Sequence, residues 1–319
     1  MRSIKSRLLL KGYKNKQSII TILLALVVMA GQAQQTMTVK DSITNEPIPF
    51  VSVYFGNDTG GYTDENGKIT IPNEAEQIRF SHICYESKSI AKVTVDSQTI
   101  FLAPISINLN EVAISARIPK RIKTTEVGSM KAKTQTKHKG ANGFEMALFI
   151  PYDSTWTETP YIHSILASLD YSTHYLVFTE IKNPIYATLR FDLRLPDAKT
   201  NAPKDESIIG GGIILPSSQK LGKDGISLIN PIPFPRTGVF VVVEWITTVQ
   251  VSESCNLVPS LNMTLDEVDN RTWNKKTFRG MDWMHEQNEP AYQNEEAQVF
   301  YKGRTPSAKL GLKISKKEI

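Results

Sequence analysis

The strongest constraint on the fold is the run Val239–Ile246, which is almost entirely apolar and rich in β-branched residues. Residues of this kind favour strands, and a strand with little polar alternation is typical of one that is buried on both faces. Pro231, Pro233 and Pro235 lie just before the run and disfavour a helix there. We therefore expect a central β-strand that is preceded by a segment of extended backbone.

Residues 35–109 contain short runs in which apolar and polar residues alternate, as in Val51–Phe55. Such alternation predicts strands with one buried face. Gly60-Gly61 and Asn66-Gly67 are turn signals between the runs. Because Asn-Gly suits the positive φ angles of a tight hairpin, we expect Asn66-Gly67 to join two antiparallel strands. This part of the chain predicts a small β-sandwich.

Residues 142–319 also show strand patterns and weak helical periodicity. We expect a larger, jelly-roll-like β-sandwich there, so that the whole chain is all-β. The predicted organisation is a signal peptide at 1–33, a small sandwich at 34–110, a basic linker at 111–141 and the larger sandwich at 142–319.

The expected linker is rich in positive charge and poor in large apolar residues. Composition favours a flexible tether, because such a segment buries too little surface to offset the entropy of ordering. The alternative is a contact with an anionic surface, such as lipid headgroups or acidic glycans, that weakens with salt. The cations that would make it are Lys120, Arg121, Lys123, Lys131, Lys133, Lys137 and Lys139.

The first 33 residues resemble a secretory signal, because a basic stretch precedes the apolar run Ile19–Ala30 and small residues follow. Cleavage before Gln34 is expected, and an uncleaved anchor is the alternative. The chain has 37 Lys and Arg against 32 Asp and Glu, but the leader holds six of the bases and no acid. The remainder carries a net charge of −1, which gives no general attraction to nucleic acid.

Two groups of residues carry a resemblance to a known family. They are Glu46–Val53, with its Pro-Ile-Pro-Phe-Val core, and Gly61–Ile69, which reads Gly-Tyr-Thr-Asp-Glu-Asn-Gly-Lys-Ile. Together with Ile78–Glu86, they resemble the carboxypeptidase-regulatory-like, transthyretin-like domain. Leu109–Ala116 is similar to the stretch that follows this domain in TonB-dependent receptors. The resemblance implies an envelope protein of a Gram-negative bacterium, at the periplasm, outer membrane or cell surface.

A receptor barrel is not expected to follow this domain. Such a barrel needs several hundred residues, and far fewer follow the expected linker. The residues after 142 also resemble a domain that accompanies this module in shorter envelope proteins, with Leu189–Leu195 and Ile232–Ile246 as the clearest matches. That similarity implies architecture and location, and no activity.

No pattern in the sequence nominates a catalytic or metal centre, and no cofactor is expected. None of His82, His138, His163, His174 and His285 stands in an HxxE or HExxH pattern, and GxSxG is absent. Gly210–Gly212 lacks the lysine of a phosphate loop and is expected to be a bend. Cys84 is expected to pack with a raised pKa, and whether it pairs with Cys255 stays open.

Aromatic residues near the end of the chain form the one candidate ligand face, made of Trp273, Trp283, Tyr292 and Tyr301. Rigid rings of this kind can bind a sugar or a peptide. The alternative, which we favour, is that they close the core of the second sandwich, because large aromatic side chains are usually mostly buried.

The leading hypothesis is a non-catalytic binding or structural protein whose partner is a glycan or an envelope protein. A secreted glycan or peptide hydrolase, with its site on the second domain, is the alternative. An accessory to a TonB-dependent outer-membrane transporter is a further alternative, which the family resemblance implies.

Overall fold

The computed structural model describes the chain in several stretches, and the predicted signal peptide lies outside them. Within the described residues, no helix is both long enough and apolar enough to cross a membrane. The described stretches are 35–75, 77–91, 98–105, 123–172, 174–175, 179–180, 184–248, 257–266 and 271–315.

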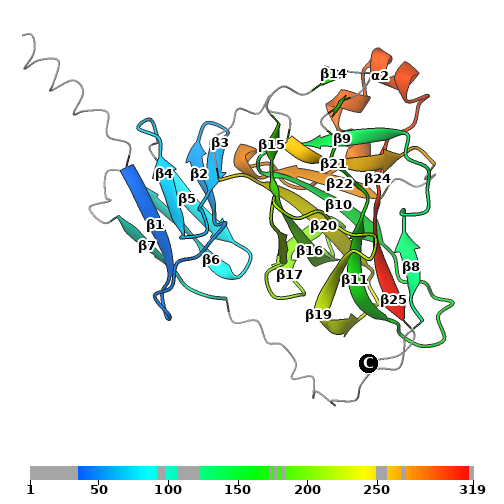
Figure 1. Cartoon of the computed structure of the whole chain (residues 1–319), viewed down its shortest axis with the longest axis horizontal. Coiled ribbons are helices and arrows are strands. Elements are labelled where there is room, and N and C mark those ends of the chain that lie inside the picture. Colours follow the sequence, from blue (N-terminus) through cyan, green and yellow to red (C-terminus); the bar gives the residue numbers. More distant parts are fainter. Residues whose placement is uncertain are drawn as a thin grey trace, which may run out of the picture.

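The first strands pack as a small two-sheet unit, which we call the first body (Figure 1, blue to cyan). One sheet has the order β4-β1-β7 and the other β3-β2-β5-β6. Met37, Ile71, Ile78, Phe80 and Leu102 are fully buried between them. The strands are β1 (Gln35–Asp41), β2 (Ser52–Gly56), β3 (Thr59–Tyr62), β4 (Lys68–Ile71), β5 (Gln77–His82), β6 (Tyr85–Ala91) and β7 (Thr99–Leu102).

The remaining strands form a larger unit of several sheets, the second body (Figure 1, green to red). Its largest sheet has the order β17-β16-β20-β10-β22-β23, and β18 also pairs with β16. The expected all-β class, a small sandwich followed by a larger β region, is confirmed. The strands of this sheet are β10 (Phe144–Ile150), β16 (Thr188–Pro196), β17 (Pro203–Ser207), β18 (Ile213–Leu215), β20 (Val239–Ile246), β22 (Thr272–Lys276) and β23 (Met284–His285).

Two further sheets complete the second body, with a small hairpin of β13 (His174–Tyr175) and β14 (Thr179–Glu180). One has the order β19 (Ile226–Pro233), β11 (Tyr161–Ala167), β25 (Leu310–Ser315) and β8 (Thr125–Gly128). In the other, β21 (Leu257–Thr264) pairs with β9 (Thr136–Gly140), β12 (Leu169–Asp170), β15 (Ile185–Tyr186) and β24 (Ser307–Ala308). Helical structure in the described residues is limited to η2 (Thr277–Arg279), η3 (Glu286–Asn288), η4 (Pro290–Tyr292) and α2 (Glu295–Phe300).

Strand β20 is central and every residue in it is buried, as the apolar run predicted. Val241, Val243 and Trp245 face the main core of the second body. Phe240 and Val242 pack on the opposite side of the sheet, where Ile246 contacts residues of the first body. The sheet therefore has an inner face on the core and an outer face that is also covered.

Three expectations about connections need correction. The second half of the expected linker is not a tether: β8 pairs with β25 and β9 pairs with β21, so Lys131, Lys133, Lys137 and Lys139 lie on or between strands. Lys123 lies just before β8, while Lys120 and Arg121 lie outside the described residues. Backbone pairing with distant strands orders this stretch even though its own composition is poor in apolar side chains.

The other two corrections concern turns in the first body. Gly60-Gly61 lies within β3, and the two-residue turn is Asn57-Asp58, where both residues have positive φ. Asn and Asp tolerate that conformation better than other non-glycine residues. Asn66-Gly67 does form a turn, but it leads from β3 in one sheet to β4 in the other, so the expected hairpin is wrong.

Candidate functional site: the junction between the two bodies

The outer face of the large sheet carries a buried cluster of charged side chains. Because alternate residues of a strand point to the same face, β16 contributes Arg190, Asp192 and Arg194. The cross-strand register then places Glu244 of β20 beside Arg190 and beside Glu145 of β10. All five residues are buried. Sequence patterns gave no indication of this cluster, which we call the charged face.

The charged face is held together by close ion pairs. Arg194 Nη1 lies 3.0 Å from Glu145 Oε2, and Arg194 Nε donates to Asp192 Oδ2 at 2.8 Å. Arg190 Nη1 donates to Glu244 Oε2 at 3.1 Å. Asp192 also accepts from the hydroxyl of Ser207 at 2.5 Å. Such pairing is required because an unpaired charge in this position would cost several kcal/mol of desolvation, on the order of 3–5 when one partner is removed.

The two glutamates of the charged face differ in their acidity. Burial and the neighbouring Glu145 raise the pKa of Glu244, although Arg190 opposes this. Burial would also raise the pKa of Glu145, but Arg194 and Lys275 together lower it. The two carboxylates differ because Glu145 also accepts a hydrogen bond from Thr277, whereas the negative charge of Glu145 acts against ionisation of Glu244.

The first body contacts this face directly. The hydroxyl of Tyr62 in β3 donates to Glu244 Oε1 at 2.5 Å, and Arg190 Nη2 donates to the backbone oxygen of Phe50 at 2.7 Å. Full burial and the Glu244 carboxylate raise the pKa of Tyr62 well above its usual value, so the phenol stays protonated as a donor. The charged face is therefore completed by hydrogen bonds from another part of the fold.

Cys84 and His82 lie at the same junction. The Cys84 thiol is 3.5 Å from the backbone oxygen of Gly210, and a Cβ atom on Gly211 would lie 2.3 Å from its sulfur. Burial raises the pKa of this free thiol, as expected, while Cys255 lies outside the described residues. Burial and the nearby Arg190 lower the pKa of His82 to about 3. The Gly210–Gly212 bend thus lies against the first body.

The phenyl ring of Phe278 packs at the junction beside Tyr62. Phe278 of η2 meets Tyr62 edge-on, with ring centroids 5.2 Å apart. A Cβ atom on Gly60 would lie 2.1 Å from this ring, and one on Gly143 would lie 2.4 Å from it. A glycine inside a strand often marks such a close approach. Because Gly60 and Gly143 have no side chain, there is room for the ring of Phe278 between the two bodies.

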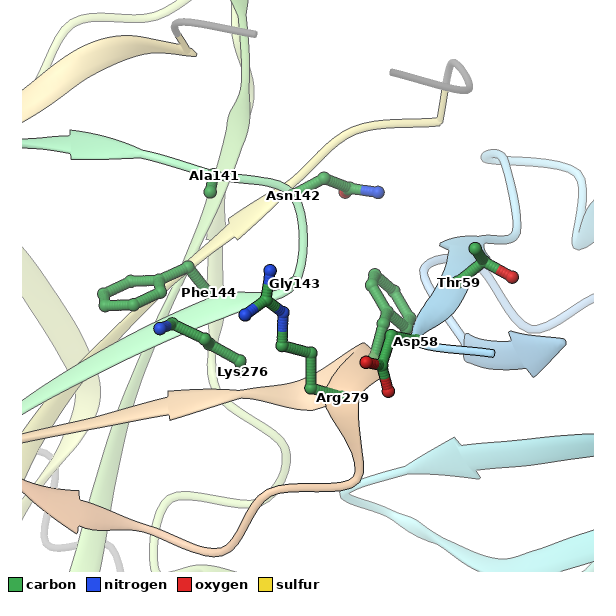
Figure 2. A pocket seen from close by; sticks show the side chains of 10 residues that line it. Asp58, Thr59, Ala141, Asn142, Gly143, Phe144, Lys276 and Arg279 are labelled. Atoms are coloured by element: carbon green, nitrogen blue, oxygen red, sulfur yellow. The ribbon is translucent and has the colours of Figure 1, made fainter. Parts of the chain in front are cut away.

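A pocket of about 320 Å³ opens at this junction. Figure 2 shows Lys276 and Arg279 of the second body on one side, and Asp58 and Thr59 of the first body on the other. Its volume is at the lower end of the range for small-molecule sites. The residues that line it are Asp58, Thr59, Gly60, Ala141, Asn142, Gly143, Phe144, Lys276, Phe278 and Arg279. We call it the junction pocket.

The four aromatic residues proposed as a ligand face fall into two pairs. Trp273 and Trp283 pack on the apolar part of the outer face, and Trp283 has the guanidinium of Arg194 over its ring at 5.7 Å. Tyr292 and Tyr301 meet edge-on at 5.4 Å in the segment that contains η4 and α2. All four side chains are half-buried. Their role in binding stays a prediction.

Glu286 links Tyr292 to Asn274 of β22 and was missed by sequence reasoning. Its Oε2 accepts from Asn274 Nδ2 of β22 at 2.6 Å, and Tyr292 also forms a hydrogen bond with its carboxyl group. Burial raises the pKa of Glu286 to about 7. Nothing in the local sequence indicates this burial, because the partners come from separate elements.

The other histidines are spread over the second body. His138 stacks on Phe144 with ring centroids 4.4 Å apart, and burial lowers its pKa to about 4. His163 Nε2 is 2.6 Å from the hydroxyl of Ser315, and His285 lies against Trp273. His174 is in β13, and its side chain is not described.

Comparison with known proteins bears on the first body. No curated protein and no solved structure matches this chain. Residues 37–114 match the model of one family, and this range contains nearly all of β1 to β7. The resemblance that the Glu46–Val53 and Gly61–Ile69 motifs carried is therefore confirmed, and the chain contains a CarboxypepD_reg-like domain at residues 37–114.

Proposed function

We propose that this chain is a non-catalytic binding or structural protein of the bacterial envelope, whose partner is a glycan or another envelope protein. In this proposal the CarboxypepD_reg-like domain is a docking unit fixed to the second body. The observation that carries it is the buried junction, where Tyr62 and Phe50 of the first body hydrogen-bond to Glu244 and Arg190.

The charged face supports a structural role for its ionisable groups. Each guanidinium there has a carboxylate partner within 3.1 Å, and the cluster is covered by the first body at one end and by Trp283 at the other. Buried ion pairs tolerate few geometries, so the ion pairs of the charged face fix how the first body sits on the second. This favours a rigid two-body scaffold that presents its outer surfaces and its junction to a partner.

The location is part of the same proposal. The signal-like leader and the domain family both favour export, with the protein in the periplasm, at the outer membrane or at the cell surface. Exposed Lys131 and Lys133, in the loop between β8 and β9, are available for contact with an anionic surface. Lys137 is less available for such contact, because it pairs with Asp170.

A glycan array probed with the full chain, run beside a hydrolase screen of the same glycans and of peptides, tests the proposed function. We expect binding of at least one class without turnover. Product release from any substrate, at a rate above that of a heat-denatured sample, would contradict the non-catalytic role.

One observation favours a hydrolase as the second candidate. A carboxyl group with a pKa near 7 can act as a general acid at neutral pH, and Glu286 has this property next to aromatic side chains. If the hydrolase screen is positive, Glu286→Gln should abolish turnover while leaving the unfolding temperature nearly unchanged. Retention of full turnover in that variant would exclude Glu286 as the acid.

A further inference from the structure

Helix α2 carries two large apolar side chains that face solvent. The exposed fraction is 79% for Val299 and 65% for Phe300, and no residue of the helix is buried. Figure 1 shows α2 projecting beyond the sheets of the second body. The rings of Phe300 and Tyr301 meet with centroids 4.8 Å apart, so the apolar surface continues past the end of the helix. Exposed apolar side chains that adjoin one another and are rimmed by polar residues are typical of an interaction site.

The end of strand β21 brings a second segment to this surface. Arg304, which follows α2, donates from Nη1 to the backbone oxygen of Leu265 at 3.1 Å. The next residue, Asp266, accepts a hydrogen bond from the backbone N–H of Lys133, in the β8–β9 loop, at 3.2 Å. The backbone N–H of Leu265 also donates to Gln135 Oε1 at 2.8 Å. Because Leu265 and Asp266 are neighbours, the β8–β9 loop lies beside the segment that follows α2.

Three exposed lysine side chains on these two segments have no ion-pair partner among the described residues. They are Lys131, Lys133 and Lys302. The acids Glu295 and Glu296 are in the first turn of α2, at the end of the helix away from Lys302, and Asp266 is the acid that adjoins the loop. The C-terminal end of α2 and the neighbouring loop therefore combine an excess of positive charge with exposed apolar side chains.

From these features we infer that the C-terminal end of α2 and the β8–β9 loop form a docking surface for an anionic lipid bilayer. The side chains of Val299 and Phe300 enter the headgroup region, while Lys131, Lys133 and Lys302 contact lipid phosphates. Charge complementarity selects this partner, because long lysine side chains around a projecting apolar tip can reach headgroups that move in the plane of the membrane. This inference rests on the proposed envelope location, and it adds a lipid contact to the proposed glycan or protein partner.

The contact is expected to be reversible. A short apolar tip removes far less hydrocarbon surface from water than a spanning helix does, so it needs the attraction of the lysines as well. Salt screens the lysine contribution but leaves the apolar contribution in place. The two contributions can therefore be separated by experiment.

The test uses the mature chain, Gln34–Ile319, because the apolar leader would itself bind lipid. Co-flotation is measured with vesicles of phosphatidylcholine alone, and with vesicles in which about one lipid in three is phosphatidylglycerol. We expect partition into the anionic vesicles to be at least about tenfold stronger, and the difference to shrink as salt is added. Equal partition into the two kinds of vesicle, or no binding to either, would overturn the inference.

Variants of α2 test the apolar contribution. Phe300→Gln should weaken partition into the anionic vesicles by about fivefold or more, because a polar amide replaces a ring that leaves water on binding. Phe300→Leu keeps an apolar side chain and should retain most of the affinity. Ile229→Gln is the matched control and should change nothing: its side chain is 97% exposed in β19, which lies at the far end of the second body from α2 (Figure 1).

A double variant of the loop tests the charge contribution. Lys131→Gln combined with Lys133→Gln should weaken partition at least about tenfold at low salt. Lys199→Gln combined with Lys223→Gln removes two exposed lysines from other connections of the second body and should have little effect. Equal losses in the two double variants would overturn the inference, because attraction would then depend on total charge alone.

The outcomes also separate a bilayer from another polyanion. Loss of binding in the Lys131 and Lys133 double variant, with full binding by Phe300→Gln, would indicate a purely electrostatic contact such as that with an acidic glycan, and would overturn the bilayer assignment. Unfolding temperatures of all these variants should match the parent chain, because the substituted side chains are exposed.

Failure of this inference is distinguishable from failure of the proposed function. Absence of vesicle binding would overturn the lipid contact and would leave binding on the glycan array standing. Hydrolysis of a glycan or peptide would contradict the non-catalytic role and would leave the lipid contact standing. Retention of the chain in the cytoplasm of its native cell would contradict the envelope location on which the inference rests.

Discussion

The two faces of the large sheet come from the same strands but are built from different chemistry. On the inner face, Phe191 of β16 and Val243 of β20 join the main core. On the outer face, the same strands present Arg190 and Glu244 as an ion pair. Apolar packing stabilises in a non-directional way, whereas buried ion pairs tolerate few geometries and contribute little net stability. The comparison indicates that the inner face stabilises the fold and the outer face selects what docks on it.

The largest effect is expected from breaking the charged face. Arg194→Met should lower the free energy of unfolding by about 3–5 kcal/mol, because Glu145 and Asp192 would be left buried without their cation. Denaturant unfolding measures this loss. Lys313→Met, which removes the partner of the exposed Asp224, is the control and should cost less than about 1 kcal/mol. Equal costs in the two variants would contradict the distinction between the buried and exposed pairs.

A smaller loss is expected when only the link between the bodies is cut. Tyr62→Phe removes the hydroxyl that donates to Glu244 and should cost about 1.5–3 kcal/mol, as for a hydrogen bond to a charged group. Tyr54→Phe, in the neighbouring strand, is the matched control. A cost below that of the control would show that the hydroxyl contributes nothing to docking.

The apolar contact at the junction can be tested without changing any charge. Gly60→Ala should cost about 1–3 kcal/mol, because the added methyl group would overlap the ring of Phe278. Combining it with Phe278→Leu should restore part of the loss, since a smaller side chain leaves room for the methyl group. Additive losses in the double variant would mean that the two residues do not interact.

The smallest effect on global stability is expected from Glu286. Its folded pKa of about 7 lies above the usual value of 4.5, so the folded state binds the proton more tightly and stability falls as pH rises from about 4.5 to 7. The loss should appear mainly as opening of the segment that contains α2, because that peripheral segment can unfold locally. Hydrogen exchange of its amides, corrected for intrinsic rates, should become faster between pH 5 and pH 8. Glu286→Gln should remove this dependence, and a variant that keeps it would exclude Glu286 as its source.

Sequence patterns predicted those strands whose own residues carry a strand signal. Strand β20 follows from the apolar, β-branched run Val239–Ile246, and β2 follows from the alternation over Val51–Phe55. The domain family of the first body followed from its turn and strand motifs. β22 and β9 were missed because their sequences are polar, and their place in the sheets is fixed by pairing with distant strands.

The junction could not be predicted for a related reason. Tyr62 and Glu244 are 182 residues apart, and neither the Gly61–Ile69 motif nor the Val239–Ile246 run indicates that the two side chains meet. Gly60 looks like a turn residue in sequence, and only the position of Phe278 explains why it lies in a strand. The charged face was hidden in the same way, since a single sequence does not show which side of a strand receives a second body.

The place of Phe278 along the chain has a consequence for assembly. The first body precedes the ring by almost the whole length of the second body, so it emerges from the ribosome well before η2 does. Until η2 is made, Tyr62 and Gly60 lack the aromatic ring against which they pack. The apolar part of the junction is therefore completed last, after the strands that carry Arg190 and Glu244 have been made.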